Sequence, residues 1–333
     1  MAGQLRQPLP AIRRVTGWPV VSAMPNTFRA RISTAASRVV AQLFRVTPQR
    51  PALGLNVPKG ERAASGTHTV WPMLKATSRF GALTGLETVG SSTRPLPVLF
   101  VHGWWGGAWV WDRFMERFAQ RGHACFAINL RGYHDSKPVA DMGNVSFDDH
   151  LEDIRTAMDA LDRPVLVTHS ASGLIALKLA ETQSIAAAVH LVPAPPAGIF
   201  SLRTARVLVR YMPLILRGKP VLLNKRDMFD ANLNRLPPDE QEAVYAKMVP
   251  APGRQSRQMM LGISVSPKKV SGPRLIQSGT DDRLTPASVH RKMARKFGST
   301  YREYAGHGHY LMREPGWEAI ADDAASWIEE HAR

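Results

Sequence analysis

The chain has 333 residues, of which 44% are hydrophobic and 21% are charged, and this composition excludes a chain that is disordered throughout. Its 43 Lys and Arg residues outnumber its 27 Asp and Glu residues, which gives a formal net charge of +16. Nine basic residues and no acidic residue stand in residues 1–60, so residues 61–333 hold 34 basic against 27 acidic residues, a net +7. Because so much of the excess lies in one terminal segment, the charge does not indicate a nucleic-acid partner.

Cysteine usage and hydrophobic runs exclude two further classes. The only cysteine, Cys125, cannot form an internal disulfide, so the protein is not a disulfide scaffold. It stands in the apolar run 124–128, which predicts a buried strand and an inert core thiol. No uninterrupted apolar run reaches the roughly 18 residues that a membrane-spanning helix needs, so we expect no transmembrane span.

The basic segment 1–60 is predicted to be an extension outside the folded body. Within it, residues 27–45 fit an amphipathic helix with Arg31, Arg38 and Arg45 at seven-residue spacing. Three interpretations stay open: a disordered extension, an organellar targeting segment, and a helix in peripheral contact with an anionic membrane. We expect a cytoplasmic protein, with an organellar location as the alternative.

From about Pro95 the chain alternates between apolar strands and helices, which predicts the α/β class. The expected strands cover residues 98–101, 124–130, 165–167, 186–192, 274–277 and 301–304. The expected helices cover residues 109–121, 147–161, 171–182, 286–297 and 315–331. Nearly continuous apolar strands, each joined to a helix, indicate a mostly parallel central sheet with helices on both faces.

Residues 196–272, here named the cap, interrupt the alternation. They contain Pro-punctuated helical stretches at 202–212 and 238–248, with 13 basic and five acidic residues. This charge indicates either a solvated helix face or a positive rim that attracts anionic substrates or lipid head groups. The predicted organisation is therefore an extension (1–60), a linker with room for the first strands (61–94), a core (95–195 and 273–333) and the helical cap.

The strongest chemical signal is a strand–turn–helix segment at residues 165–174, with Ser170 at its apex. The positions two residues before and after Ser170 are Thr168 and Ser172, which are small but not the Gly residues of the usual G-x-S-x-G pattern. The backbone N–H of Ala171, at the start of the helix, is free to stabilise an oxyanion. Taken alone, a serine at such a junction is more often a helix cap than a nucleophile.

Three further motifs follow strand ends and favour the catalytic interpretation. The Gly-rich loop 102–107 follows the first core strand and offers the N–H of Trp104 as a second oxyanion donor. Residues 279–286 follow the fifth strand and contain two adjacent acids, Asp281 and Asp282. Residues 306–310 follow the sixth strand and contain His307 and His309. The order nucleophile, acid, histidine suits a Ser–His–acid site on this fold.

With these motifs, residues 95–333 resemble the α/β-hydrolase superfamily, and in particular serine hydrolases with an HG-W-x-G-A-W loop and a GHGHW-type histidine segment. The resemblance implies the α/β-hydrolase fold with an inserted helical cap and Ser170 as the nucleophile. It favours Asp282 as the acid, because the family's acid stands four residues before a Pro, here Pro286. It favours His309 as the base, because the family's base precedes an aromatic residue, here Tyr310.

The remaining motif residues receive supporting roles. We expect His102 and His169 to orient loops by hydrogen bonding, and residues 131–136 to form a structural turn. Trp104 and Trp105 are candidates for lining an apolar acyl pocket, with Trp105 the preferred one. No His/Cys/Asp cluster has metal-ligand spacing and no phosphate-binding glycine loop is present, so no metal and no cofactor are predicted.

The resemblance implies a serine hydrolase that cleaves a carboxylic ester, or a related acyl bond, of a small apolar substrate through an acyl-enzyme. A C–C bond hydrolase, a lactonase and a perhydrolase use the same triad and stay open as alternatives. A non-catalytic hydrolase-like binding protein is the alternative from another class, because Thr168 and Ser172 depart from the usual pattern. The oligomeric state is left open.

Overall fold

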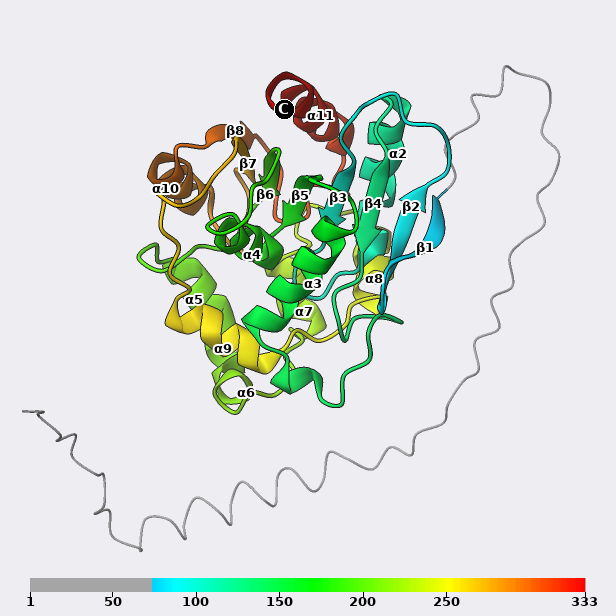
Figure 1. Ribbon diagram of the computed structural model, residues 1–333. Coiled ribbons are helices and arrows are strands. Elements are labelled where there is room, and N and C mark those ends of the chain that lie inside the picture. Colours follow the sequence, from blue (N-terminus) through cyan, green and yellow to red (C-terminus); the bar gives the residue numbers. More distant parts are fainter. Residues whose placement is uncertain (1–73, 333) are drawn as a thin grey trace, which may run out of the picture. The chain divides into compact units, whose positions relative to one another are not determined.

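The computed structural model describes residues 74–332, and the predicted extension at 1–60, with the helix at 27–45, lies outside them. The described residues form an eight-stranded sheet in the order β1-β2-β4-β3-β5-β6-β7-β8 (Figure 1). The strands are β1 (Leu74–Phe80), β2 (Leu83–Thr88), β3 (Val98–Val101), β4 (Cys125–Ile128), β5 (Val165–His169), β6 (Ala188–Leu191), β7 (Arg274–Gly279) and β8 (Thr300–Tyr304). β2 pairs antiparallel with β1 and β4, and all the other pairs are parallel.

Helices cover both faces of this sheet because successive side chains of its strands point to opposite sides. In β3, Val98 and Phe100 pack into one core cluster, and Leu99 and Val101 into the other. The first cluster includes residues of α2 and α11, and the second includes residues of α3, α4 and α10. These helices are α2 (Asp112–Gln120), α3 (Phe147–Asp159), α4 (Ala171–Leu179), α10 (Ala287–Phe297) and α11 (Trp317–His331). The predicted mostly parallel sheet with two helical layers is confirmed.

The five helices predicted for the body and two of its strands, β4 and β6, have shorter ends than predicted, whereas β5, β7 and β8 are longer. The helix expected from residue 109 begins as a 3₁₀ turn, η1 (Ala108–Trp111), before α2. A second 3₁₀ turn, η2 (Met142–Asn144), precedes α3. Cys125 is buried in β4, where burial raises the pKa of its thiol.

Between β6 and β7 the regular secondary structure of the described chain is helical, apart from one isolated bridge between Val221 and Ala251. The elements here are α5 (Leu202–Leu208), η3 (Val209–Tyr211), α6 (Met212–Leu216), α7 (Lys225–Ala231), α8 (Pro238–Ala246) and α9 (Gly253–Leu261). The helical stretch expected at 202–212 is present as α5 followed by the 3₁₀ turn η3, and the chain continues into α6. Pro213 lacks the N–H that would bond the Val209 carbonyl, and its ring would crowd that carbonyl.

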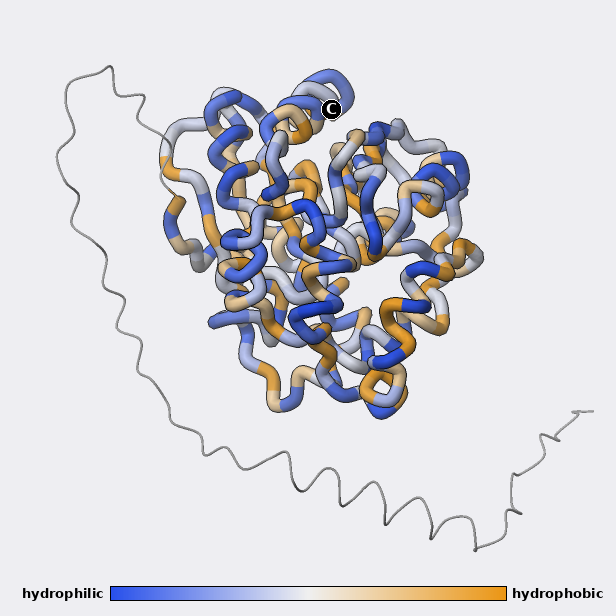
Figure 2. The backbone as a smooth tube through the Cα atoms, turned by 180° about the vertical axis from the view of Figure 1, so that it is seen from behind, coloured by the Kyte–Doolittle hydropathy of each residue, from blue (hydrophilic) through white to orange (hydrophobic). Residues whose placement is uncertain are grey.

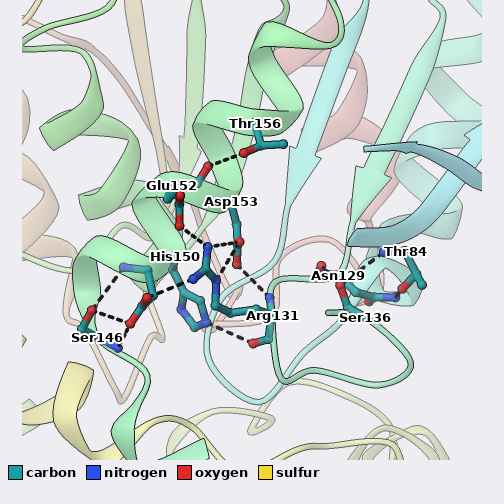
Figure 3. Close-up of polar contacts among 10 residues, drawn as sticks. Thr84, Asn129, Arg131, Ser136, Ser146, His150, Glu152, Asp153 and Thr156 are labelled. Atoms are coloured by element: carbon teal, nitrogen blue, oxygen red, sulfur yellow. Dashed lines mark hydrogen bonds and ion pairs between the residues drawn. The ribbon is translucent and has the colours of Figure 1, made fainter. Parts of the chain in front are cut away.

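A polar network fixes the turn after β4 to helix α3 (Figure 3). The Arg131 backbone N–H and its Nε both donate to Asp153, at 2.8 Å each. The Arg131 guanidinium also pairs with Asp149 at 2.9 Å and Glu152 at 2.5 Å. Ser146 and Asp149 form a capping box that begins α3, so the same carboxylate caps the helix and holds the arginine. Residue 131 therefore has a structural role in the described chain.

The same turn supports the Gly-rich loop through Asn129. The Asn129 side chain accepts a hydrogen bond from the backbone N–H of Ala108 at 2.7 Å and donates to Thr84 at 3.0 Å. The Ser136 hydroxyl donates to the Asn129 carbonyl at 2.7 Å (Figure 3). The loop that follows β3 is thereby held to Asn129, the residue that follows β4. Within residues 74–332, no helix has the length and apolar character needed to cross a membrane.

Candidate active site

Ser170 lies at the sharp turn where β5 ends and α4 begins. Its φ of 53° and ψ of −117° lie outside the regions that a non-glycine residue prefers, so the turn is strained. Two backbone bonds hold the strained residue to the end of β6: Ser170 N–H donates to the Leu191 carbonyl at 3.0 Å, and Ala194 N–H donates to the Ser170 carbonyl at 2.9 Å. The side chain is partly exposed, as a nucleophile requires.

The structure accommodates both departures from G-x-S-x-G. Thr168 is paired in register with His190 of β6, and their side chains hydrogen-bond at 2.7 Å. The Ser172 hydroxyl lies 2.8 Å from the Val101 carbonyl and 2.9 Å from the His169 carbonyl. The helix instead packs tightly against the chain after β6 at Gly173, where an added Cβ would stand 2.7 Å from the Cβ of Pro193. The glycine that tight packing requires therefore stands three residues after Ser170.

Three predicted residues from distant parts of the sequence form a continuous hydrogen-bonded chain. His309 Nε2 lies 3.0 Å from Ser170 Oγ, and His309 Nδ1 lies 2.7 Å from Asp282 Oδ2. Asp282 and His309 are each 1% exposed. In this arrangement His309 Nδ1–H donates to the carboxylate, which leaves Nε2 free to accept the serine proton.

The geometry separates the two adjacent acids. Asp282 Oδ1 accepts hydrogen bonds from the N–H groups of Leu284 at 2.8 Å and Thr285 at 2.7 Å, so its other oxygen is directed at His309. Asp281 is partly exposed and its carboxylate pairs with Arg235 of the cap. The structure therefore brings Asp282, and not Asp281, to the histidine.

The Gly-rich loop lies directly against the serine turn. An added Cβ at Gly103 would stand 2.9 Å from Ser170 Cβ and 2.8 Å from the His169 carbonyl oxygen. Among the described residues, no acceptor is bonded to the N–H of Trp104, which follows Gly103, or to that of Ala171, which opens α4. Both predicted oxyanion donors are therefore free of acceptors in the described chain, and each directly follows a residue of the close contact between Gly103 and Ser170.

The cap holds the two tryptophans of this loop. Trp104 donates its indole N–H to Gln255 at 3.0 Å, and Trp105 donates its indole N–H to the Val221 carbonyl at 2.8 Å. Val249 N–H donates to the Trp105 carbonyl at 3.1 Å. Trp105 is 2% exposed and belongs to the core cluster, whereas Trp104 is partly exposed. Trp104 is thus the more accessible of the two, and a pocket-lining role for Trp105 stays a prediction.

Two buried histidines orient the loops, in the manner that we expected. His102 Nε2 accepts from Leu130 N–H at 3.2 Å, so its Nδ1 carries the proton and donates to the Gly103 carbonyl at 2.7 Å. Burial lowers the pKa of His102 to about 3. His169 Nε2 donates to the His309 carbonyl at 2.9 Å, and burial, with the nearby charge of His309, lowers the pKa of His169 well below its usual value. Both side chains are therefore neutral and their donor atoms are fixed.

Sequence reasoning missed Glu314, which organises the histidine loop. Its buried carboxylate accepts the N–H of Gly308 at 2.7 Å and of Tyr310 at 2.9 Å, the two residues that flank His309. The same carboxylate lies 3.2 Å from Nδ1 of His307, so this second histidine of the loop contacts Glu314. The available signal was a lone acid beside the apolar residues 310–312, where burial requires partners.

Residues 98–323 match the model of the alpha/beta hydrolase family. The chain belongs to this family, and its fold and family identify the protein as a hydrolase. It is similar in fold to a membrane phospholipase A described as a bacterial virulence factor (TM-score 0.60, 17% identity, covering 78% of this chain and 86% of that chain). It is also similar in fold to a thermophilic esterase from Thermogutta terrifontis (TM-score 0.57, 19% identity, covering 74% of this chain and 94% of that chain). A third similar structure is a Paleococcus ferrophilus monoacylglycerol lipase (TM-score 0.59, 21% identity, covering 75% of this chain and 99% of that chain).

Proposed function

We propose that the protein hydrolyses carboxylic esters through a covalent acyl-enzyme on Ser170. The observation that carries this proposal is the unbroken chain from Ser170 Oγ through His309 to Asp282, with distances of 3.0 and 2.7 Å. The esterase, monoacylglycerol lipase and phospholipase names of the similar structures support an ester as the substrate class.

In the proposed first half-reaction, His309 Nε2 takes the proton of Ser170 as Oγ attacks the ester carbonyl carbon. The N–H groups of Trp104 and Ala171 stabilise the resulting oxyanion, and the Asp282 carboxylate stabilises the imidazolium. His309 then gives its proton to the leaving alcohol as the ester C–O bond breaks. In the second half-reaction, water attacks the acyl-enzyme with His309 as the base, which releases the acid and restores Ser170.

An apolar acyl group is the substrate part that this site suits best. The partly exposed Trp104 follows Gly103, which lies against the nucleophile, and its ring packs at 5.9 Å from that of the buried Trp105. Aromatic surface beside a nucleophile binds an apolar chain through contact area. Thr168 and Ser172 depart from the usual glycine pattern, and for this reason a non-catalytic binding protein was the alternative. The hydroxyl groups of both residues are hydrogen-bonded, and Ser170 Oγ still lies within hydrogen-bond distance of His309.

A fluorophosphonate probe tests the nucleophile, and a panel of nitrophenyl esters from acetate to long-chain acyl groups tests the substrate class. The folded wild type should be labelled and should turn over at least one ester, whereas Ser170→Ala and unfolded wild type should not be labelled. Absence of labelling and turnover in folded wild type would contradict a serine hydrolase. Labelling without ester turnover would instead favour a lactone or C–C bond substrate.

A further inference from the structure

Exposed apolar side chains gather on one part of the cap. Of the eight large hydrophobic residues that are exposed within the described chain, all except Val89 lie at residues 200–216 or 260–261. They are Phe200, Leu202, Val209, Leu214, Leu216, Met260 and Leu261, with exposed fractions from 39% to 78%. A group of exposed apolar residues on one region of a protein marks an interaction site more often than a solvated surface.

The same elements carry cations and no acids. Helices α5 to α6 with the residues up to 220 contain five basic residues, and α9 contains Arg254 and Arg257, with no Asp or Glu in either stretch. All five acidic residues of the cap lie instead on α7 and α8. Within the described chain, Arg203, Arg206 and Arg217 have no carboxylate partner. We name the outward surface of α5, η3, α6 and α9 the cationic cap face.

Contacts at both ends show that these elements lie side by side. Ala197 N–H, before α5, donates to the Ile263 carbonyl just beyond α9, and Arg257 of α9 donates to the Leu216 carbonyl at the end of α6. The α5–α6 stretch and α9 therefore run antiparallel as one layer (Figure 1). Seen from behind, hydrophilic and hydrophobic residues alternate along this part of the chain, at the lower right of Figure 2.

Only one side of this layer is used for folding. Val207 and Leu208 pack against the core, and Tyr211 and Ile215 are buried in it. Leu202, Arg206 and Val209 follow one another at helical spacing on the opposite side and are exposed. The inner side thus satisfies the core, while the outer side combines apolar and cationic groups that the described chain does not cover.

A cavity of about 500 Å³ opens beside this face. Its charged lining consists of four arginines and two carboxylates, namely Arg203, Arg206, Arg210, Arg283, Asp227 and Asp230. The two carboxylates are already paired, Asp227 with Arg210 at 2.8 Å and Asp230 with Arg283 at 2.6 Å. Arg203 and Arg206 are left to bind an anion such as a phosphate group.

We propose that the cationic cap face docks on the anionic surface of a lipid bilayer, with the apolar side chains in the interface and the arginines on phosphate head groups. Charge selects this occupant. Residues 1–60 are themselves basic and free of acids, and a second copy would oppose this face with the same cations, so both would be repelled. A purely charged partner would leave the exposed apolar residues without a role, whereas a bilayer interface receives both kinds of group.

The docked face lies next to the catalytic loop. Thr204 of α5 donates to the Leu284 carbonyl at 2.6 Å, and Leu284 N–H donates to Asp282 at 2.8 Å. A protein bound through α5 would therefore hold its acid loop close to the lipid surface. The docking itself is independent of catalysis, so its test does not depend on the proposed function.

Vesicle co-sedimentation of the full chain tests the proposal. Vesicles of phosphatidylcholine alone are compared with vesicles that contain roughly one-fifth phosphatidylglycerol. The Ser170→Ala variant serves as the parent so that no hydrolysis alters the lipid. It should bind the anionic vesicles, release from them as salt rises, and bind the neutral vesicles weakly.

Two pairs of changes in this parent locate the contact. Arg203→Gln/Arg206→Gln should weaken binding to anionic vesicles by about 30-fold, since each surface cation contributes about fivefold. Val209→Ser/Leu216→Ser should weaken it by about tenfold or more through lost apolar burial. Arg155→Gln/Lys292→Gln removes two exposed cations from the body helices α3 and α10 and should bind like the parent.

All these side chains are exposed, so unchanged thermal unfolding will show that each variant folds. Equal loss in the control pair would show general charge attraction and overturn the assignment to this face. Full binding by both cap variants would place any membrane contact elsewhere, for example in residues 27–45. Absence of binding to both vesicles would overturn the lipid surface and leave an acidic protein as the partner.

Discussion

Gly103 and Ser170 approach so closely that a Cβ atom on Gly103 would stand 2.9 Å from the Cβ of Ser170. Real Cβ atoms are essentially never this close, so the side chain of any other residue at position 103 would push the Gly-rich loop away from Ser170. The distance between the loop and the serine turn is therefore set by the absence of one methyl group.

Gly103→Ala should lower kcat/KM for ester hydrolysis by about a hundredfold, because displacement of the oxyanion donors by a fraction of an ångström misaligns the reacting atoms. Steady-state kinetics will measure the loss. Gly106→Ala is the matched control in the same loop, since its nearest contacts would be 3.4 Å away, and it should retain activity near that of wild type. Equal loss in both variants would contradict this explanation.

Asp282→Asn should reduce kcat by roughly 10³–10⁴-fold, because the amide no longer holds the His309 tautomer or stabilises the imidazolium. Asp281→Asn, one residue earlier, removes the surface ion pair with Arg235, keeps an oxygen that can accept the Thr280 hydroxyl, and should leave kcat nearly unchanged. The two variants are compared in the same ester assay. A greater loss from Asp281→Asn would assign the acid to the other residue.

Glu314→Gln should lower kcat without an equal rise in KM, and should cost about 2 kcal/mol of unfolding free energy. The amide keeps one acceptor oxygen, but its NH₂ group faces an N–H that the carboxylate had bonded, so the loop that positions His309 loosens. Kinetics and denaturant titration measure the two effects. Glu318→Gln, an exposed change on α11, is the control and should alter neither.

The protein should lose stability as the pH falls from about 6.5 toward 4. Burial lowers the pKa of His190 to about 3 and that of His290 to about 4, so the unfolded chain takes up protons that the folded chain does not. The stability that these groups contribute is complete above pH 6.5 and decreases during acidification. At pH 5, His190 alone would account for about 2 kcal/mol.

His190→Gln should therefore reduce the slope of unfolding free energy against pH, measured by denaturant titration between pH 7 and 5. Thr168→Val removes the same 2.7 Å hydrogen bond and no titratable group, so it should lower stability equally at each pH. An identical slope in wild type and His190→Gln would refute this account.

The core strands and the serine turn could be predicted because their information is local. Residues 98–101 and 165–167 are apolar without interruption, which is what a strand covered on both faces requires, and the small residues around Ser170 mark the turn.

The choice between neighbouring residues required more than local pattern. Asp281 and Asp282 are adjacent acids on one loop, and only the family resemblance favoured the second. In the structure, the N–H groups of Leu284 and Thr285 hold one oxygen of Asp282 and direct the other to His309. The spacing of these residues in the sequence does not indicate which of the two carboxylates points at His309.

The sequence was sufficient for the fold class, the strand order along the chain, and a set of candidates that included Ser170 and His309, because burial and turn chemistry leave periodic local signals. The role of Glu314, the hold of Gln255 on Trp104, and the grouping of exposed apolar and cationic residues on α5, α6 and α9 became visible only in three dimensions. Each depends on contacts between segments far apart in the chain, which are selected by packing and have no fixed spacing in the sequence.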